Sequence, residues 1–521
     1  PLTKSGRTLR DCRPCARWAA TWRGCSNASR RAKPAASPCR SANPFSAPIL
    51  SANFEEISKI PRGSGNEKGI SDYLLNFGKE LGLESIQDEA LNVIIKKPGT
   101  PGYENAPTVI IQGHMDMVCE KNNGVEHDFE KDPLKLRIVD DYIYATDTTL
   151  GADNGIAVAY AMAILASNDI PHPPIEVLLT TDEETGMSGA MAIKKENLQG
   201  KILINLDNEE EGYLLVSCAG GVRSTATLKV DEQEIGSKKL IKINISGLKG
   251  GHSGMDIIKE RGNSNKILGR VLKGLLREVK FNLVSLNGGS KNNAIPREAE
   301  AIIAVNPNDE NTAIEVINNW NNIIENELRA QDPGLKIEAS ITDIKTCKEF
   351  TDESTKKVVD LLYIYPNGIN SKSTEIEGLV ESSTNLGVLT TKDGVVEFDS
   401  AIRSSIPSLK EEIVLRSKTI VELLGGKFET TSDYPGWEYD PNSKVRDICQ
   451  KVHKDMYGKE AKIVAIHAGV ECGLFNEKLG NLDMISFGPN LYDVHTPDEH
   501  MSISSVKNCY EYLLGILKEI R

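Results

Sequence analysis

Long apolar runs are missing from this chain of 521 residues, and so is any regular spacing of cysteines. A membrane-spanning helix needs about 20 consecutive apolar residues, so the sequence predicts no membrane span. Four of the ten cysteines lie within the first 47 residues, and the others are scattered without a pairing pattern. Such a distribution favours a reducing environment without disulfides. We therefore expect a cytoplasmic protein with no membrane partner.

Positive charge is scarce over most of the chain. The net charge is −13, yet residues 1–47 hold ten Lys or Arg against a single acid, Asp11, for a local charge of +9. The remaining residues therefore carry a charge of −22. Proteins that bind nucleic acids use basic surfaces to neutralise phosphates, so an acidic body argues against nucleic acid as a partner.

The first 47 residues differ from the rest in composition. They begin without Met, are rich in Arg, Ser, Ala and Pro, and contain Cys12, Cys15, Cys25 and Cys39. An organelle transit peptide has such a composition. Upstream or vector-derived sequence and a small zinc knuckle are the alternatives, although the cysteine spacing is irregular for zinc. We expect residues 1–47 to be disordered or extraneous to the fold.

Short apolar runs in the rest of the chain predict buried strands. Residues 108–112, 175–181, 202–206 and 484–487 are apolar, include β-branched side chains and stop at turn-forming or polar residues. Helical patterns such as residues 155–167 lie between them. Strands that alternate with helices predict an α/β domain with a parallel or mixed sheet, and 521 residues suffice for two sizeable domains.

Side chains that can bind metal ions follow these runs. The candidates are His114, Asp153, Glu184, Asp207 and His495, with Asp116 and Glu183 beside them. Each has an ordinary structural explanation by itself, such as an Asp in a turn or an acidic pair at a helix N-terminus. Ligands of α/β sheets, however, bind at the carboxyl ends of the strands. Together the candidates predict a dinuclear metal site, which suits water activation and amide hydrolysis.

Six segments make the chain resemble a known family, the di-metal aminopeptidases and deacylases that include carnosinases, tripeptidase T and acetylornithine deacetylase. The segments are GHMDMV at 113–118, TLGADNG at 149–155, TTDEETG at 180–186, NLD at 205–207, GGHSG at 250–254 and VHTPDE at 494–499. The resemblance runs in order over about residues 50–521. It is strongest to the dipeptidase members of the family.

The resemblance implies how the candidates divide between two metal ions. His114 and Asp207 would bind one ion, and Asp153 would bridge to the other. Glu184 and His495 would complete the second site. His and carboxylate ligands suit zinc, with cobalt and manganese as alternatives. By the same resemblance, Asp at position 207 is typical of members that require a free amino terminus, whereas deacylases have Glu there.

The resemblance also implies roles for Asp116 and Glu183. Asp116 resembles the residue that orients a metal-bound imidazole. Glu183 resembles the general base, which takes a proton from water and passes it to the leaving amine. Glu183 and Glu184 are adjacent and cannot occupy one position, and only the resemblance decides which of them binds metal.

Residues 221–435 have a different character. Alternating segments at 240–246 and 298–305 are mixed with helical patterns at 264–280 and 312–328, which indicates an α+β insertion. The resemblance implies a large lid domain that interrupts an α/β catalytic domain made of residues 48–220 and 436–521. The lid has about 210 residues, twice the usual size in the family, so its second half is predicted to stand in for a partner's lid. The sequence leaves the oligomeric state open between a monomer and a homodimer.

The resemblance also implies functional residues in the lid. His252 would stabilise the oxyanion, and Arg403 would hold a substrate carboxylate. A turn His and a solvated strand Arg are the structural alternatives. Further substrate-binding candidates are Asn293, Asn385 and Glu471, the last of which we prefer to the nearby His467.

Together these observations predict a cytoplasmic metal-dependent dipeptidase. Its substrates would be short peptides with a free amino terminus, and the resemblance implies Xaa-His dipeptides, carnosine among them. A tripeptidase or an amino-acid deacylase on the same scaffold is an alternative. A metal-binding protein without catalysis is a third possibility, which the presence of Glu183 and all five metal candidates disfavours.

Overall fold

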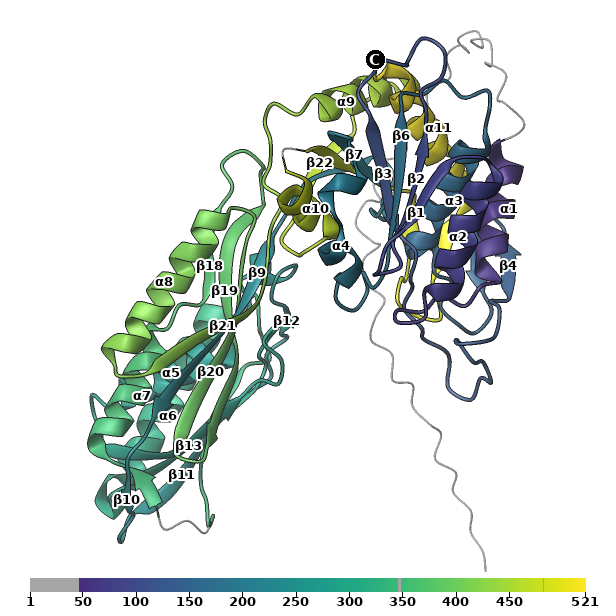
Figure 1. The fold of residues 1–521 in the computed structure, drawn as a ribbon. Helices are drawn as coiled ribbons and strands as arrows, with labels where there is room; N and C mark the ends of the chain where they lie inside the picture. Colours follow the sequence, from purple (N-terminus) through teal and green to yellow (C-terminus); the bar gives the residue numbers. More distant parts are fainter. Residues whose placement is uncertain (1–45, 345–347, 481) are drawn as a thin grey trace, which may run out of the picture. The chain divides into compact units, whose positions relative to one another are not determined.

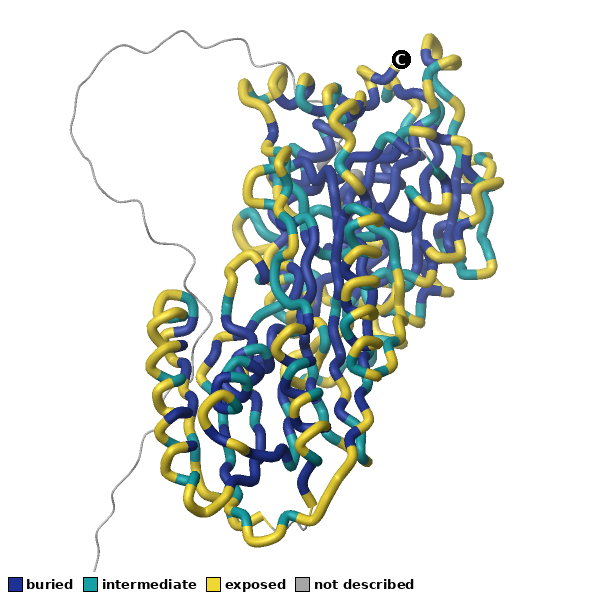
Figure 2. The backbone as a smooth tube through the Cα atoms, turned by 90° about the vertical axis from the view of Figure 1, so that its left-hand side faces the viewer, coloured by how far each residue is buried: buried dark blue, intermediate teal, exposed yellow. Residues whose placement is uncertain are grey.

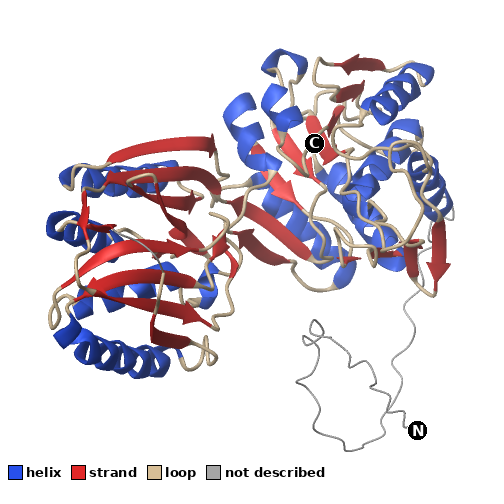
Figure 3. Ribbon diagram, turned by 90° about the horizontal axis from the view of Figure 1, so that it is seen from below, coloured by secondary structure: helices blue, strands red, loops and turns tan. Residues whose placement is uncertain are grey.

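The computed structural model describes residues 46–344, 348–480 and 482–521. The predicted N-terminal segment, residues 1–47, therefore lies outside the described residues except for its last two, which begin helix α1 (Ser46–Ser58). In the described part, strands and helices form two large sheets with flanking helices (Figures 1 and 3). No helix among these residues is long and apolar enough to cross a membrane.

The first sheet has eight strands in the order β1-β2-β6-β3-β7-β23-β8-β22. Its central strands β6, β3, β7 and β23 run parallel, whereas β1 and β2 at one edge are antiparallel. The predicted α/β mixed sheet is thus confirmed. The strands are β1 (Glu84–Gln87), β2 (Val93–Lys97), β3 (Val109–His114), β6 (Ile175–Thr180), β7 (Ile202–Asn205), β8 (Tyr213–Cys218), β22 (Lys462–Ile466) and β23 (Asp483–Ser486).

Apolar side chains on both faces of this sheet are buried, because helices cover each face. Alternate residues of a strand point to opposite faces: Val109 and Ile111 of β3 belong to one core, while Ile110 belongs to another. Helices on the first face are α1, α2 (Lys68–Glu80), α3 (Ala152–Ala166), α9 (Lys444–Tyr457) and α11 (Ile503–Glu519). Helices on the second face are α4 (Ser188–Ala192) and α10 (Glu471–Leu479).

The second sheet has nine antiparallel strands and is built from residues between β8 and α9. Helices α5–α8 pack along it (Figure 1). Few residues of α6 and α8 are buried, and coiled segments in Figure 2 change between buried and exposed positions along their length. Helix α5 ends at Leu275, five residues before the predicted end, because the chain turns there to enter β13. The elements are β9 (Gly220–Lys229), β11 (Lys239–Ser246), α5 (Ser264–Leu275), β13 (Phe281–Gly288), β15 (Ala299–Val305), α6 (Glu310–Leu328), β16 (Lys336–Ile341), α7 (Asp352–Ile364), β18 (Gly368–Lys372), β19 (Val380–Lys392), β20 (Val395–Ser404), α8 (Pro407–Leu423) and β21 (Lys427–Tyr434).

Two halves of this second sheet meet at a narrow junction. Strands β16, β11, β15 and β13 form one half, and β18, β19, β20, β9 and β21 form the other. Their junction pairs β13 with β19 through Gly288 and Leu389. Smaller sheets comprise β4 (Leu136–Val139), β5 (Tyr142–Ala145), β24 (Leu491–Tyr492) and β25 (His500–Ser502), then β10 (Glu232–Glu234) with β17 (Lys348–Phe350), and β12 (Gly251–His252) with β14 (Ala294–Ile295).

The chain passes between the two sheets at two points that lie side by side. Cys218 and Trp437 exchange two backbone hydrogen bonds of 3.0 Å there. The neighbouring Gly220 and Gly436 come so close that a Cβ on Gly220 would lie 2.5 Å from the backbone nitrogen of Gly436. Side chains are excluded from this crossing, which explains the glycine on each passage.

Candidate metal centre

His114 lies at the carboxyl end of β3 and faces two carboxylates. Its Nε2 is 3.2 Å from Oδ1 of Asp153, at the start of α3, and 3.3 Å from Oδ1 of Asp207, just after β7. Only 1% of the His114 side chain and 11% of each Asp side chain are exposed. A buried nitrogen and two carboxylate oxygens thus converge on one point.

A second group shares Asp153 with the first. Oδ2 of Asp153, its other oxygen, is 3.2 Å from Nε2 of His495, and the same nitrogen is 3.0 Å from Oε2 of Glu184. Donor atoms of His114, Asp153 and Glu184 all lie within 4.8 Å of one another. The carboxylate of Asp153 therefore offers one oxygen to each group, which is the geometry of a bridging ligand between two ions.

The electrostatics of these groups fit bound cations. Burial, followed by neighbouring carboxylates, raises the pKa of Asp207 to about 6 and that of Glu183 to about 9. Hydrogen bonds to Asp153 and Glu184 raise the pKa of His495 to about 11, a measure of how strongly these carboxylates favour a positive charge beside them. Closely packed carboxylates are stable only with compensating cations, and divalent metal ions would supply this charge through ligands of the right kind.

Asp116 connects His114 to the segment that carries Glu183 and Glu184. It is fully buried, and its oxygens lie 3.2 Å from Nδ1 of His114 and 2.7 Å from the donating hydroxyl of Ser64. The backbone N–H groups of Glu183 and Glu184 donate to the same carboxylate at 3.2 and 3.3 Å. The predicted contact with the imidazole is present, while Ser64 and the two backbone amides were not anticipated from the sequence.

Glu471 lies beneath the metal candidates, at the start of α10. It is fully buried, and its Oε2 accepts hydrogen bonds from Nε2 of Gln112 (2.6 Å) and the hydroxyl of Thr180 (2.8 Å). Asn205 in turn donates to Gln112. Gln112, Thr180 and Asn205 lie on β3, β6 and β7, so this hydrogen-bonded network joins the ends of three strands below the metal candidates. Burial raises the pKa of Glu471 to about 8.

Replacing Glu471 with Gln is expected to remove a pH dependence of stability. The folded protein holds the proton of Glu471 up to about pH 8, whereas the unfolded chain releases it near pH 4.5. Stability therefore falls as pH rises through this window. Between pH 6 and pH 8 the metal-free wild type should lose about 2 kcal/mol that the Glu471→Gln variant keeps. Urea unfolding at both pH values measures this difference, and parallel profiles for the two proteins would contradict it.

A second cluster of predicted residues surrounds Arg403 on β20. Its side chain is buried, with 8% of the residue exposed, and Nη1 donates to the hydroxyl of Tyr434 at 2.9 Å. His467 lies nearby with Nε2 2.7 Å from the hydroxyl of Ser383, and burial followed by the charge of Arg403 lowers the pKa of His467 to about 3. Within the described residues, Nε of Arg403 has no hydrogen-bond partner. A buried cation with a free N–H beside a neutral imidazole forms a subsite suited to an anion.

His252 belongs to this second cluster. Nδ1 of its ring accepts from the backbone N–H groups of Gly254 and Met255, at 3.3 and 3.1 Å, so the ring proton of the neutral form is on Nε2. Burial and then the charge of Arg403 lower the pKa of His252, which keeps the ring neutral. In residues 46–344, 348–480 and 482–521, no hydrogen bond or ion pair joins His252 or Arg403 to the five metal candidates.

Asn385 and Asn293 form hydrogen bonds with the loops beside His252. Nδ2 of Asn385, a buried side chain, donates to the backbone oxygens of Asn292 and Ala294, both at 2.9 Å. The side chain of Asn293 is exposed, while its backbone oxygen accepts from the N–H of Ser253 at 2.8 Å. Oδ1 of Asn385 accepts from Nδ2 of Asn263 at 3.2 Å, so its amide stabilises the conformation of this loop.

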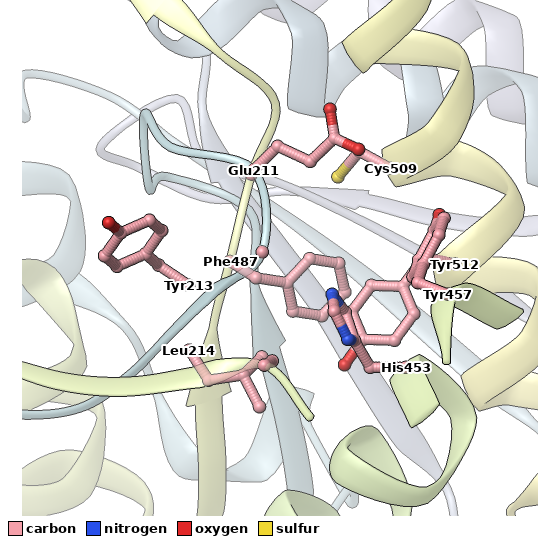
Figure 4. A pocket seen from close by; sticks show the side chains of 11 residues that line it. Glu211, Tyr213, Leu214, His453, Tyr457, Phe487, Cys509 and Tyr512 are labelled. Atoms are coloured by element: carbon pink, nitrogen blue, oxygen red, sulfur yellow. The ribbon is translucent and has the colours of Figure 1, made fainter. Parts of the chain in front are cut away.

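A small pocket beside α9 and α11 is too narrow to bind a substrate. Its volume is about 10 Å³, and Glu211, His453, Phe487, Cys509 and Tyr512 are among its lining residues (Figure 4). Such a volume holds one water molecule at most. Glu211, at the end of the acidic run after Asp207, accepts a hydrogen bond from Asn508 at 3.0 Å.

Known proteins resemble the chain over nearly its whole length. The model of peptidase family M20/M25/M40 matches residues 110–519. Cytosol non-specific dipeptidase of Escherichia coli K12 is 40% identical over 469 residues, which cover 90% of this chain and 96% of the relative. The crystal structure of aminoacylhistidine dipeptidase from Vibrio alginolyticus matches with a TM-score of 0.88 and 38% identity, over 93% of this chain and 98% of that one. Aminopeptidase PepT from Bacillus cereus shares the fold, with a TM-score of 0.53 and 16% identity over 91% of this chain and 99% of its own.

Proposed function

The chain belongs to peptidase family M20/M25/M40, and we propose that it is a metal-dependent dipeptidase acting on dipeptides with a free amino terminus. The observation that carries this proposal is the position of Asp153, whose two oxygens face His114 and His495 at 3.2 Å each. With Asp207 on one side and Glu184 on the other, the five residues would hold two divalent ions. Their nitrogen and oxygen donors suit zinc.

Water activation is the chemistry that the two ions would supply. Bound together, they would lower the pKa of a water molecule and polarise the scissile carbonyl. Glu183 would then act as the general base, because Glu184 is engaged with His495 and Glu183 is not. The cationic charge of the centre would bring the pKa of Glu183 down from about 9, so that it accepts the proton of the water. Glu183 would next deliver this proton to the nitrogen of the leaving amino acid.

The cluster around Arg403 would hold the carboxyl end of the dipeptide. The guanidinium of Arg403 is buried beside neutral His467 without a carboxylate partner among the described residues, so a substrate carboxylate would complete it. His252 would donate from Nε2 to the oxyanion. Both roles require the segment of residues 221–435 to close over the metal centre as a lid, with residues 48–220 and 436–521 as the catalytic domain. The division of its sheet into two halves, of four and five strands, supports the proposed double lid.

Replacing Arg403 with Met is expected to raise the KM for dipeptides by about 10²-fold with little change in kcat. A charge-assisted hydrogen bond contributes about 1.5–3 kcal/mol, and this contact is present equally in the ground state and the transition state. Arg223→Met is the matched control, because Arg223 lies on the adjacent strand β9 and is already paired with Asp399 at 2.6 Å. A dipeptide amide, which lacks the carboxylate, should be turned over equally by wild type and Arg403→Met. An unchanged KM for the free dipeptide would contradict the assignment.

The substrate range separates this proposal from its alternatives. Two of the three similar proteins described above are dipeptidases by name, one non-specific and one acting on aminoacyl-histidine. We propose Xaa-His dipeptides as substrates and the cytoplasm as the site of action. Hydrolysis of Ala-His, β-Ala-His, Leu-Gly-Gly and N-acetyl-ornithine, before and after chelation, tests this. Preferred turnover of the tripeptide or of the acetylated amino acid would favour the tripeptidase or the deacylase.

A further inference from the structure

Glu499 is a buried carboxylate whose four hydrogen-bond donors all belong to the segment that carries Asp153. Its Oε2 accepts from the backbone N–H groups of Leu150 (2.7 Å) and Gly151 (3.0 Å). Its Oε1 accepts from those of Ala152 (2.8 Å) and Asp153 (3.4 Å). Only 2% of Glu499 is exposed. The first N–H groups of a helix lack intrahelical partners. Gly151, at the N-cap of α3, has no side chain that could accept hydrogen bonds from them. Glu499 therefore caps α3 from a distant part of the chain.

Arg62 holds the same segment from another side. It donates to the backbone oxygen of Gly151, and also to those of Met115 and Asp116 at 3.1 and 3.2 Å. The side chain is 2% exposed, so these backbone oxygens replace its hydration. A Cβ on Gly151 or Gly155 would lie 2.6 Å from Nη2 of Arg62, which explains both glycines. Arg62 therefore connects the loop after β3 to the loop before α3.

Glu499 is also close in sequence to His495, which contacts Asp153. It follows His495 by four residues, and the imidazole of His495 lies 3.2 Å from Asp153. One short segment thus supplies a candidate ligand of the second ion and the carboxylate that shapes the backbone of the bridging residue. Any displacement of Glu499 moves Asp153 relative to both imidazoles.

We propose that Glu499, supported by Arg62, is a positioning residue that sets the spacing of the two metal ions by fixing the backbone under Asp153. The inference rests on the proposed metal centre. Both oxygens of Glu499 are occupied by hydrogen bonds from four backbone N–H groups, so its side chain contacts neither an ion nor the substrate. It acts through Asp153. Metal–ligand distances tolerate changes of only about 0.2 Å. A small shift of this backbone therefore weakens the binding of the ion that depends most on the bridging carboxylate.

The test compares Glu499→Gln with Glu176→Gln. Glu176, in β6, is an equally buried carboxylate that accepts backbone N–H groups of Gln199 and Gly200 at 2.9–3.0 Å, in a loop without any metal candidate. Each substitution places an amide NH₂ against backbone donors, so both should lower the unfolding midpoint of the metal-free protein alike. Equilibrium dialysis and the d–d absorption spectrum with Co²⁺ as the probe then report the two binding steps.

Glu499→Gln should raise the dissociation constant of the second Co²⁺ about 10- to 100-fold and change the spectrum of the doubly loaded protein. Glu176→Gln should bind both ions as the wild type does. Equal affinity of Glu499→Gln and wild type would overturn the inference, as would an equal loss in Glu176→Gln. Glu499→Asp keeps the charge on a shorter side chain and gives the same comparison if the Gln variant does not fold. A wild type that binds no pair of ions would instead refute the proposed metal centre itself.

Discussion

Replacing Glu183 with Gln is expected to lower kcat about 10³-fold while both metal ions and the dipeptide remain bound. General-base catalysis contributes about 10²- to 10⁴-fold, and an amide of the same shape cannot accept the proton of the attacking water. The backbone N–H of Glu183 still donates to Asp116 in this variant, because the substitution changes only the side chain. Metal content, KM and kcat, measured at saturating Zn²⁺, separate loss of chemistry from loss of binding.

The neighbouring variant Glu184→Gln provides the contrast. Glu184 lies 3.0 Å from His495 and belongs to the second group of metal candidates, so its substitution should release one ion together with activity. Excess Zn²⁺ should restore part of the activity of Glu184→Gln and none of the activity of Glu183→Gln. If Glu183→Gln keeps near wild-type kcat, or loses metal as Glu184→Gln does, the roles of the two glutamates are assigned wrongly.

The second large effect is expected from Asp153→Asn, which removes the charge shared by both groups. Its oxygens face His114 and His495, so a neutral amide weakens both ion sites at once. We expect kcat/KM to fall about 10³-fold or more, which corresponds to about 4 kcal/mol of lost transition-state stabilisation. Chelation of the wild type should abolish activity to the same extent, and added Zn²⁺ should restore it.

Asp483→Asn is the matched control for this variant. Asp483, in β23 of the first sheet, accepts hydrogen bonds from the hydroxyl of Ser443 and the backbone N–H groups of Lys444 and Val445, at the start of α9. Its substitution should cost stability through a weakened helix cap and leave metal content unchanged. Metal analysis by mass spectrometry and thermal unfolding of both variants make the comparison. Full metal occupancy in Asp153→Asn would argue against a bridging role.

The strands that carry the candidate site were predictable because their signals are local. An apolar run that stops at a polar residue identifies a buried strand and its end within one or two residues, as for β3, β6 and β7. Parallel strands bring their carboxyl ends to one edge, so His114 and Asp207 were expected near each other. The end of α5 was missed, because nothing in the helical pattern up to residue 280 marks the turn that tertiary packing imposes after Leu275.

The supporting contacts were not predictable, because they join segments far apart in the chain. Glu499 is 346 residues from Asp153, and Arg62 is 53 residues from Met115. The sequence contains one indirect signal for Glu499, since a helix that begins after Gly151 without a capping side chain must find an acceptor elsewhere. It contains no signal that selects Glu499 among 74 acidic residues.

By itself, the sequence determined which side chains can bind metal ions or act in catalysis, and where the strands that precede them end. Periodicity and turn residues express local preferences of the backbone, which any segment carries with it. Only the tertiary structure decided that Asp153 offers one oxygen to each imidazole, that Glu471 lies below the centre, and that Arg403 and His252 form a separate cluster. These arrangements depend on packing between distant segments, where a shift below 1 Å separates a hydrogen bond from no contact.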